Sequence, residues 1–311
     1  EIYEYINNPA HPFCGEIQIN LFFNEFKERK YKILAGYINA HPINSFKNVH
    51  IMTENQDFFV AFQKELPNIQ KTGAANLLIL DQNGIKFVGE KVFTDLMSFT
   101  CTDVLFFVSS SAVKRFISEG AIQKYISLSP EDLEYISSRD IHRVICNEYY
   151  RKLIPPLKRY YLAPFSIKKS PNIYGVIFGS GSLLGLDKFL SVCWTLDTYT
   201  GEANYNIDND KLRDSNGQLS FLPEDNVIKK QDEFRKSLIE FLKTGKKTNL
   251  DTYQFCLESG FLPKHANSIL REIQRDGNLQ TFTFNTTENA RKNAFYLSWN
   301  DYNSDIPKIH I

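Results

Sequence analysis

Two kinds of hydrophobic pattern alternate along the first 110 residues. Short apolar runs of strand length are separated by longer segments whose apolar residues recur at helical spacing. The pattern predicts strands at 16–23, 49–52, 76–80 and 103–108, with helices at 27–38, 58–66 and 91–99. Such alternation is typical of parallel strands joined by right-handed crossovers in a doubly wound α/β sheet. Residues 76–80 read NLLIL, so we expect a central strand that is buried on both faces.

The rest of the chain predicts a change of architecture. We expect helices within 112–160, a strand at 173–178, a helix at 186–196 and a last strand at 202–207. After a polar stretch, the pattern predicts helices at 227–243, 250–258 and 263–275, then a hairpin of 279–284 with 294–299. Three helices followed by a hairpin is the winged-helix pattern. We therefore expect a sheet domain at 1–210, a linker at 211–226 and a winged-helix-like domain at 227–311.

Composition excludes several classes of protein. The chain carries 36 basic and 36 acidic residues, so any surface that attracts a polyanion has to be local. Its five cysteines lie far apart and mostly within apolar runs, as buried free thiols do. No apolar run approaches the roughly 20 residues of a membrane span, and no signal-peptide pattern opens the chain. We therefore expect a cytoplasmic protein that has no membrane-spanning segment.

Polar residues follow all four predicted strands of the first 110 residues. They are Asn24 with Glu25, residues 55–57, residues 81–83 and residues 109–111. Ligands of open α/β sheets bind outside the carboxyl ends of the strands. The sequence therefore predicts a ligand site along this edge.

The first two strand ends carry acids that suit a nucleoside. Glu25 can accept both hydroxyls of a ribose, because a carboxylate offers two acceptor oxygens. Asp57 can accept a hydrogen bond from an adenine amino group, with Phe58 or Phe59 as a stacking wall. The alternative interpretation makes both acids caps of the helices that follow them.

The third strand end carries three polar groups together. Asp81, Gln82 and Asn83 leave the apolar strand, and Gly84 permits a tight turn behind them. A carboxylate and two amides that converge in a crevice suit the orientation of an amine or amide, such as a nucleobase edge. The alternative is an Asn-Gly turn in which Asp81 is tied to nearby backbone amides. We take Asp81, Gln82 and Asn83 as the candidate catalytic set.

Residues 149–186 contain no acidic residue and interleave cations with rings. This is the composition of a track for single-stranded nucleic acid. The candidate contacts are Arg151, Lys152, Lys158, Arg159, Lys168 and Lys169, among Tyr149, Tyr150, Tyr160, Tyr161, Phe165 and Tyr174. The alternative is a solvated face whose aromatic side chains belong to the core. The glycine loop at 179–185 has the wrong spacing for a dinucleotide fingerprint, and we interpret it as a structural turn.

The last predicted helix carries a polar, positive face that suits a major groove. Its candidate contacts are Lys264, His265, Asn267, Arg271 and Arg275, with Arg291 and Lys292 in the wing. Acids nearby (Glu272, Asp276 and Glu288) dilute the positive field of this helix. Many winged helices bind proteins instead, so both kinds of partner stay open.

Six segments together resemble the three-Cys-motif partner protein family. They are LLILDQNGIKFV (77–88), TDVLFFVSSSAVKRF (102–116), APFSIKK (163–169), NIYGVIFGS (172–180), LDKFLSVCWTLD (186–197) and GEANYNI (201–207). Such proteins are prokaryotic, are encoded beside a phage-type protein with a three-cysteine, radical-SAM-like motif, and resemble class I S-adenosylmethionine-dependent methyltransferases. The resemblance covers most of residues 16–300 and implies a Rossmann-like, methyltransferase-type sheet.

The resemblance implies roles for individual residues. Glu25 falls on the ribose acid and Asp57 on the adenine contact, so we take Glu25, Asp57 and Phe58 as cofactor-binding residues. Residues 81–83 fall on the catalytic strand end, where Gln82 and Asn83 replace a Pro-aromatic pair that many relatives carry. The glycine-rich first loop of such proteins would precede residue 1.

Two functional hypotheses follow. The first is a methyltransferase-like protein that acts on or binds DNA or RNA, together with a three-Cys-motif partner protein. Asp81 and Gln82 would then hold a nitrogen in line with the methyl group of S-adenosylmethionine, without a covalent intermediate. The second is a catalytically degenerate Rossmann and winged-helix module that binds nucleic acid or protein. We find no clustered acid-lysine set of metal-ligand type, so a nuclease is disfavoured and no metal is expected.

Overall fold

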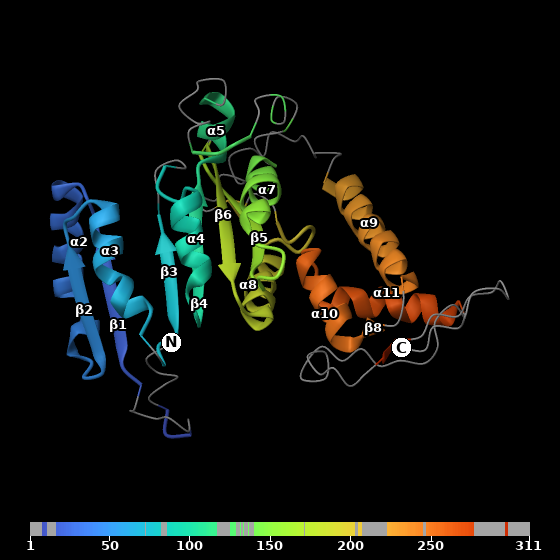
Figure 1. Cartoon of the computed structure of the whole chain (residues 1–311), viewed down its shortest axis with the longest axis horizontal. Helices are drawn as coiled ribbons and strands as arrows, with labels where there is room; N and C mark the ends of the chain where they lie inside the picture. The colour runs from blue at the N-terminus through green and yellow to red at the C-terminus, as the bar shows by residue number, and fades with distance from the viewer. Residues whose placement is uncertain are drawn as a thin grey trace. The chain divides into compact units, whose positions relative to one another are not determined.

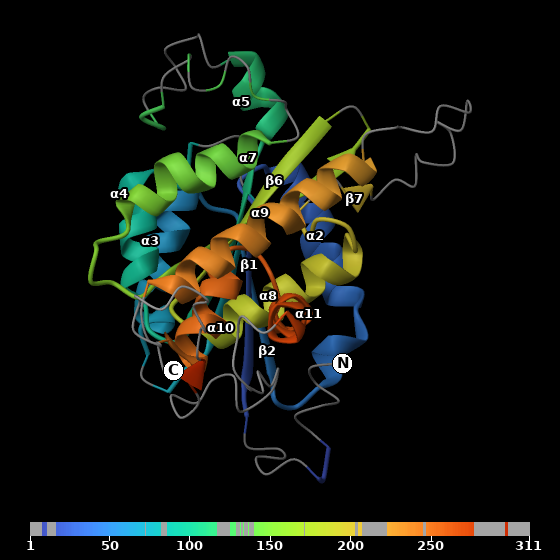
Figure 2. The same ribbon diagram turned by 90° about the vertical axis from the view of Figure 1, so that its right-hand side faces the viewer.

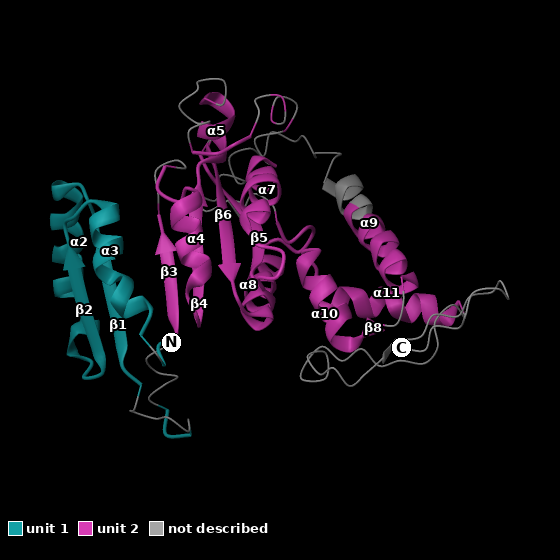
Figure 3. Ribbon diagram, viewed as in Figure 1, with its two compact units in different colours: residues 1–74 teal, residues 75–311 magenta. Residues whose placement is uncertain are grey.

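The computed structural model describes residues 8–10, 17–71, 73–81, 86–116, 125–128, 131, 133, 136, 140–170, 172–202, 205–206, 223–244, 247–276 and 296–297. The chain forms two compact units, residues 1–74 and residues 75–311, which Figure 3 colours separately. Each unit is described by itself.

The described residues of the first unit form two parallel strands and two α-helices. Its elements are β1 (Ile19–Asn24), α2 (Glu28–Ala40), the single turn η1 (Pro42–Ser45), β2 (Val49–Glu54) and α3 (Phe58–Ile69). The strands pair from Ile19 opposite Val49 to Asn24 opposite Glu54. Because the pairing continues to the last residue of each strand, the two carboxyl ends lie side by side.

The sheet of the second unit is mixed. Its strand order is β3 (Asn76–Leu80), β4 (Thr102–Val108), β6 (Asn172–Ser180), β5 (Tyr161–Lys169) and β7 (Tyr205–Asn206). β3 and β4 are parallel, β6 is antiparallel to both of its neighbours, and β7 is parallel to β5. Of these five strands, β6 therefore runs against the other four.

Helices and a cluster of aromatic rings accompany this sheet. The helices are α4 (Glu90–Ser98), α5 (Ser110–Phe116), α7 (Ile141–Val144) and α8 (Leu183–Leu196), with a π-helical turn η2 (Ile145–Tyr150) and a 3-10 turn η3 (Arg151–Leu153) after α7. The ring of Tyr150 lies 4.9 Å from that of Phe93 and 4.8 Å from that of Phe106, between centroids. Its hydroxyl donates to the carbonyl oxygen of Val88 at 2.7 Å, as a buried phenol requires.

Within its described residues, the C-terminal part contains three helices and two short strands. They are α9 (Pro223–Lys243), β8 (Lys247–Thr248), α10 (Asn249–Glu258), α11 (Pro263–Arg275) and β9 (Tyr296–Leu297). β8 and β9 pair antiparallel. Figure 1 shows α10, α11 and β8 gathered below α9, and Figure 2 shows α9 running across the same group from another side.

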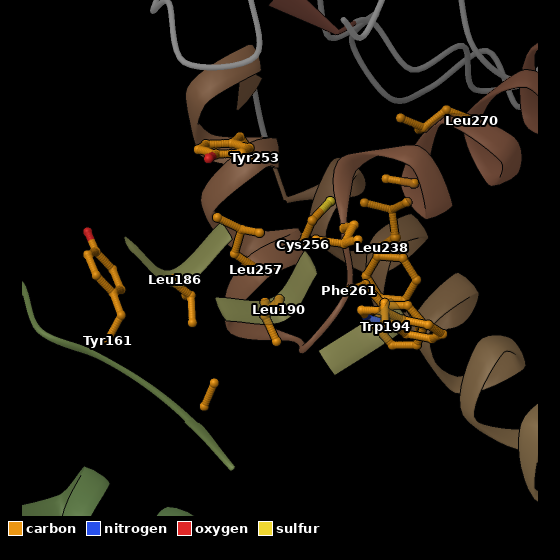
Figure 4. Close-up of a cluster of buried hydrophobic side chains, with 14 of the residues drawn as sticks. Tyr161, Leu186, Leu190, Trp194, Leu238, Tyr253, Cys256, Leu257, Phe261 and Leu270 are labelled. Carbon is orange, nitrogen blue, oxygen red and sulfur yellow. The ribbon is translucent and has the colours of Figure 1, made fainter. Parts of the chain in front are cut away.

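One hydrophobic core joins these helices to the sheet (Figure 4). Leu190 and Trp194 of α8 belong to the same buried cluster as Leu238 of α9 and Leu257 of α10. The hydroxyl of Tyr253 on α10 donates to Oδ2 of Asp187 on α8 at 2.8 Å. The C-terminal helices are therefore packed on α8 instead of standing apart from the sheet.

The predicted α/β class is confirmed, and the observed bounds of β3 and α11 are those predicted. The expectation that residues 76–80 form a central strand is wrong for the sheet described here. β3 is at its edge, and Leu77 and Ile79 are 58% and 60% exposed. β5 and β8 were not among the predicted elements. Residues 279–284 and 211–222 lie outside the described residues, and residues 223–226 of the predicted linker begin α9.

Candidate cofactor site and nucleic-acid interface

The loops that follow β1 and β2 are joined by side-chain hydrogen bonds. Nδ2 of Asn24 donates to the carbonyl oxygen of Gln56, and the amide of Gln56 donates to Oδ1 of Asn24, both at 3.1 Å. Nδ2 of Asn55 donates to the carbonyl oxygens of Glu25 at 2.6 Å and Phe26 at 2.8 Å. These bonds hold the two strand ends in a fixed relation before any ligand arrives.

Glu25 and Asp57 lie on these two loops, as the sequence predicts. Oε1 of Glu25 accepts a hydrogen bond from the amide of Lys27 at 2.8 Å, at the start of α2. Oδ1 of Asp57 caps α3 by accepting from the amide of Phe59 at 2.9 Å. The capping interpretation is thus confirmed for Asp57. Within the described residues, the second oxygen of each carboxylate makes no hydrogen bond and can accept one from a ligand.

The aromatic residues beside Asp57 differ in exposure. Phe58 is half-buried, and its ring stacks on Phe62 with centroids 5.6 Å apart and planes 14° apart. Phe59 is 43% exposed and meets Phe58 edge-on at 5.3 Å. Phe59 therefore offers more open ring surface to a base than Phe58 does.

Asp81 is exposed directly after β3 in the second unit. Gln82 and Asn83 lie outside the described residues. The structure brings Glu25 and Asp57 together in the first unit, and Asp81 belongs to the second, so the catalytic assignment of Asp81 stays a prediction.

A buried polar pair that the sequence analysis did not single out lies beyond the end of β4. Ser110 and His142 are 0% and 1% exposed, and the Ser110 hydroxyl and both ring nitrogens of His142 have no hydrogen-bond partner within the described residues. A Cβ at Gly175 would lie 2.3 Å from Cβ of His142 and 3.1 Å from Oγ of Ser110. Burial lowers the pKa of His142 to about 4, so its imidazole is neutral at physiological pH.

The structure places most of the candidate rings of segment 149–186 where bases cannot stack on them. Five of the six candidate rings are buried in the core and cannot stack on bases: Tyr149, Tyr150, Tyr160, Tyr161 and Phe165. Arg151 and Lys152 are engaged locally, because Arg151 Nη2 donates to the Leu162 carbonyl oxygen at 3.3 Å and Lys152 pairs with Glu148 at 2.8 Å. Of the other candidates, Lys158, Arg159 and Lys169 are exposed and Lys168 is half-buried. The alternative interpretation, a solvated face over core aromatics, describes this segment.

Close packing explains two glycines of the loop at 179–185. A Cβ at Gly179 would lie 2.6 Å from the hydroxyl of Tyr160. A Cβ at Gly185 would lie 2.7 Å from Oγ of Ser180 and 3.0 Å from Oδ1 of Asp103. This agrees with a structural turn.

The candidates on α11 divide into two groups. Lys264 and Arg271 are exposed. His265 instead anchors the helix, because its Nδ1 accepts from the amide of Leu262 at 3.0 Å and its ring lies 4.1 Å from that of Trp194. Burial, together with the positive charges of Lys264 and Lys230, lowers the pKa of His265 to about 4. Arg291 and Lys292 lie outside the described residues.

Three of the four described cysteines are buried free thiols, as expected: Cys146, Cys193 and Cys256. Burial raises the pKa of each, to about 12 for Cys146 and Cys193, so none is a reactive thiolate. Cys101 is exposed.

Comparisons of the chain with protein-family models, curated proteins and solved structures find no match. Among the helices that the structure describes, none has both the length and the apolar character needed to cross a bilayer. In the same residues, no three His, Cys, Asp or Glu side chains gather as a metal site would require.

Proposed function

We propose that the protein is an S-adenosylmethionine-dependent, methyltransferase-like protein that binds nucleic acid and works with a three-Cys-motif partner protein. The observation that carries the proposal is the joined pair of loops after β1 and β2. They hold Glu25 and Asp57 at neighbouring strand ends, each with one carboxylate oxygen still able to accept a hydrogen bond. An acid at such a position suits ribose hydroxyls, and a preorganised site loses less free energy on binding.

The order of the remaining elements supports the two-part architecture of the proposal. Four of the five described strands of the mixed sheet run in one direction, with β6 reversed between β4 and β5, and mixed sheets are common among large α/β sheets. The C-terminal elements follow the order helix, strand, helix, helix, strand, and the two strands pair. That order supports a winged-helix-like part.

The chemistry assigned to Asp81 is orientation. S-adenosylmethionine supplies a methyl group bound to a positively charged sulfur. The exposed carboxylate of Asp81 would accept a hydrogen bond from an amino group of the acceptor and aim its nitrogen at that methyl group. Asp81 would thus act through position and form no covalent bond to the acceptor.

Calorimetric titration with S-adenosylmethionine tests the cofactor site. We expect the wild-type protein to bind, and Glu25→Ala to weaken binding at least about tenfold through loss of the ribose contacts. Asp57→Ser keeps a capping hydroxyl and removes the second carboxylate oxygen, so it should weaken binding without uncapping α3. Glu28→Ala is the matched control, because Glu28 is an exposed acid in the first turn of α2. Absence of binding by the wild-type protein would refute the methyltransferase-like proposal.

The second hypothesis, a degenerate binding module, is favoured by one specific observation. Glu25 and Asp57 both accept a backbone N–H at the start of the following helix, a structural role that needs no cofactor. This hypothesis requires nucleic-acid or protein binding without affinity for S-adenosylmethionine. If methyl transfer is found, Asp81→Ala should abolish it and leave cofactor binding intact. Unchanged methyl transfer would overturn the role of Asp81.

A further inference from the structure

We infer that α10 and α11 form a helix-turn-helix whose second helix binds double-stranded DNA through one exposed, positively charged face. The inference rests on the proposed function in naming nucleic acid as the partner. It goes beyond that proposal by assigning the helix, the side chains, the strandedness and the type of nucleic acid.

The connection between the two helices has the form that this motif requires. α10 ends at Glu258 and α11 begins at Pro263, so the turn is Ser259, Gly260, Phe261 and Leu262. Helix-turn-helix connections have three to four residues and often contain glycine. Gly260 has φ +79°, in the left-handed region that other residues rarely adopt.

Positive and small polar side chains share one face of α11. Lys264, Ser268, Arg271 and Arg275 are all exposed. At 100° per residue, these positions fall within an arc of about 60°, and they span roughly 16 Å along the axis. Ala266, Leu270 and Ile273 are buried on the other side of the helix. The exposed face is therefore a straight basic stripe on a helix whose opposite face is held in the core.

Within the part of the chain that the structure describes, the two acids in and directly after α11 lie off this stripe. Glu272, the acid within α11, lies about 80° around the helix axis from Lys264 and forms an ion pair with Arg235 of α9. Asp276 follows the helix and lies about 120° around its axis from Lys264. The stripe therefore presents its positive charge to solvent.

Several contacts hold α11 and its turn rigidly against the rest of the unit. Nε1 of Trp194 donates to the carbonyl oxygen of Gly260 at 3.0 Å, and the Phe261 ring stacks on Phe234 with centroids 4.0 Å apart. At the start of α11, Nδ1 of His265 accepts a hydrogen bond from the backbone amide of Leu262. A rigid helix presents its side chains to a groove with little loss of conformational entropy.

The composition of the stripe favours duplex DNA over other polyanions. Single-strand sites use exposed rings for stacking, and the stripe carries none. A membrane-surface helix needs large apolar side chains beside its cations, and here those are buried. The major groove of B-DNA is about 12 Å wide and admits a helix, whereas that of A-form RNA is too narrow.

Fluorescence anisotropy with a labelled 20-base-pair DNA, its single strand and the matching RNA duplex tests the inference. We expect the DNA duplex to bind most tightly. The triple variant Lys264→Ala, Arg271→Ala, Arg275→Ala should lose at least about tenfold in affinity, and its salt slope should fall by roughly 3. The charge-matched control replaces Lys47, Lys91 and Lys188, exposed lysines that belong to no candidate interface, by alanine and should keep the wild-type affinity.

Two outcomes would overturn the inference. One is an equal loss in both triple variants, which would mean attraction by overall charge. The other is tighter binding of the single strand or of the RNA duplex. Titration of the α11 variant with S-adenosylmethionine separates the two proposals, because its cofactor affinity should not change. A wild-type protein that binds the DNA duplex but not the cofactor would refute the proposed function and leave this inference standing.

Discussion

Glu202 and Lys230 form an ion pair of 2.7 Å between the loop after α8 and helix α9, and their side chains are only 14% and 17% exposed. The other carboxylate oxygen of Glu202 accepts from Nε of Arg143 on α7 at 2.9 Å. The carbonyl oxygen of Glu202 accepts from the amide of Ser166 on β5 at 3.1 Å. Glu202 therefore connects α7, β5 and α9, and so ties the sheet to the helices that carry α11.

Glu202→Ala should lower the free energy of unfolding by about 3 kcal/mol, because it leaves the mostly buried ammonium of Lys230 without its carboxylate and also removes the pair with the more exposed Arg143. Lys230→Ala should cost less, since Glu202 keeps Arg143. The control is Lys32→Ala, which breaks the exposed pair with Glu28 and should cost less than about 0.5 kcal/mol. Urea denaturation followed by circular dichroism measures all three. Equal costs for Glu202→Ala and Lys32→Ala would contradict the role of Glu202.

Acid should destabilise the protein through His142 and His265. Burial lowers both pKa values to about 4, below the ordinary 6.5, so the unfolded chain binds protons that the folded protein does not. Their stabilising contribution is complete above pH 6.5 and is lost as the pH falls towards 4. The expected loss between pH 7 and pH 5 is about 2 kcal/mol for His142, and it is smaller for His265, whose partial exposure lets solvent screen the effect.

His265→Gln tests this assignment. Glutamine does not titrate, and at this third helical position it can still accept from the backbone amide of Leu262. Unfolding measured from pH 7 to pH 5 should show a shallower loss of stability than in the wild-type protein. An unchanged pH dependence would show that His265 does not contribute.

Gly175→Ala should be strongly destabilising, by about 3 kcal/mol, because its Cβ would overlap His142. Gly36→Ala is the matched control in the exposed face of α2, where a Cβ meets nothing within 4 Å. That change should stabilise the protein by about 0.5–1 kcal/mol, because alanine favours the helix. Thermal unfolding of both variants shows whether the first loses stability and the second gains it. A tolerated Gly175→Ala would mean that His142 is not packed against this strand.

The exposed side of β3 should accept charge. Leu77→Lys and Ile79→Lys each place a charge on a side chain that is more than half exposed, so each should cost less than about 1 kcal/mol. Both should also reduce self-association on heating, because an exposed apolar edge strand is a site of aggregation. Leu78→Lys, at a half-buried position of the same strand, is the control and should cost more. Light scattering on heating measures self-association, and urea denaturation measures the free energy of unfolding. Equal costs at positions 77 and 78 would argue against a solvent-exposed face of β3 at Leu77.

Local signals in the sequence were enough for many elements. Proline at position 263 and apolar residues at helical spacing predict α11 with the observed bounds, and the apolar run 76–80 predicts β3. β5 was missed because Pro164 lies inside it and its pattern does not alternate. β8 was missed because it is only two residues long and exists through its pairing with β9.

The sequence by itself determined the α/β class, the polar strand ends at Glu25 and Asp57, and the basic side chains of α11, because periodicity and helix signals are properties of neighbouring residues. Tertiary structure decided which of the candidate side chains are free to contact a ligand or a partner and which belong to the core. It buried the rings of segment 149–186, turned His265 into an anchor for α11, and joined the loops of Glu25 and Asp57 through Asn24 and Asn55. It also placed β3 at the edge of its sheet. Each of these outcomes depends on contacts between residues that are distant in the chain, and no local pattern encodes such contacts.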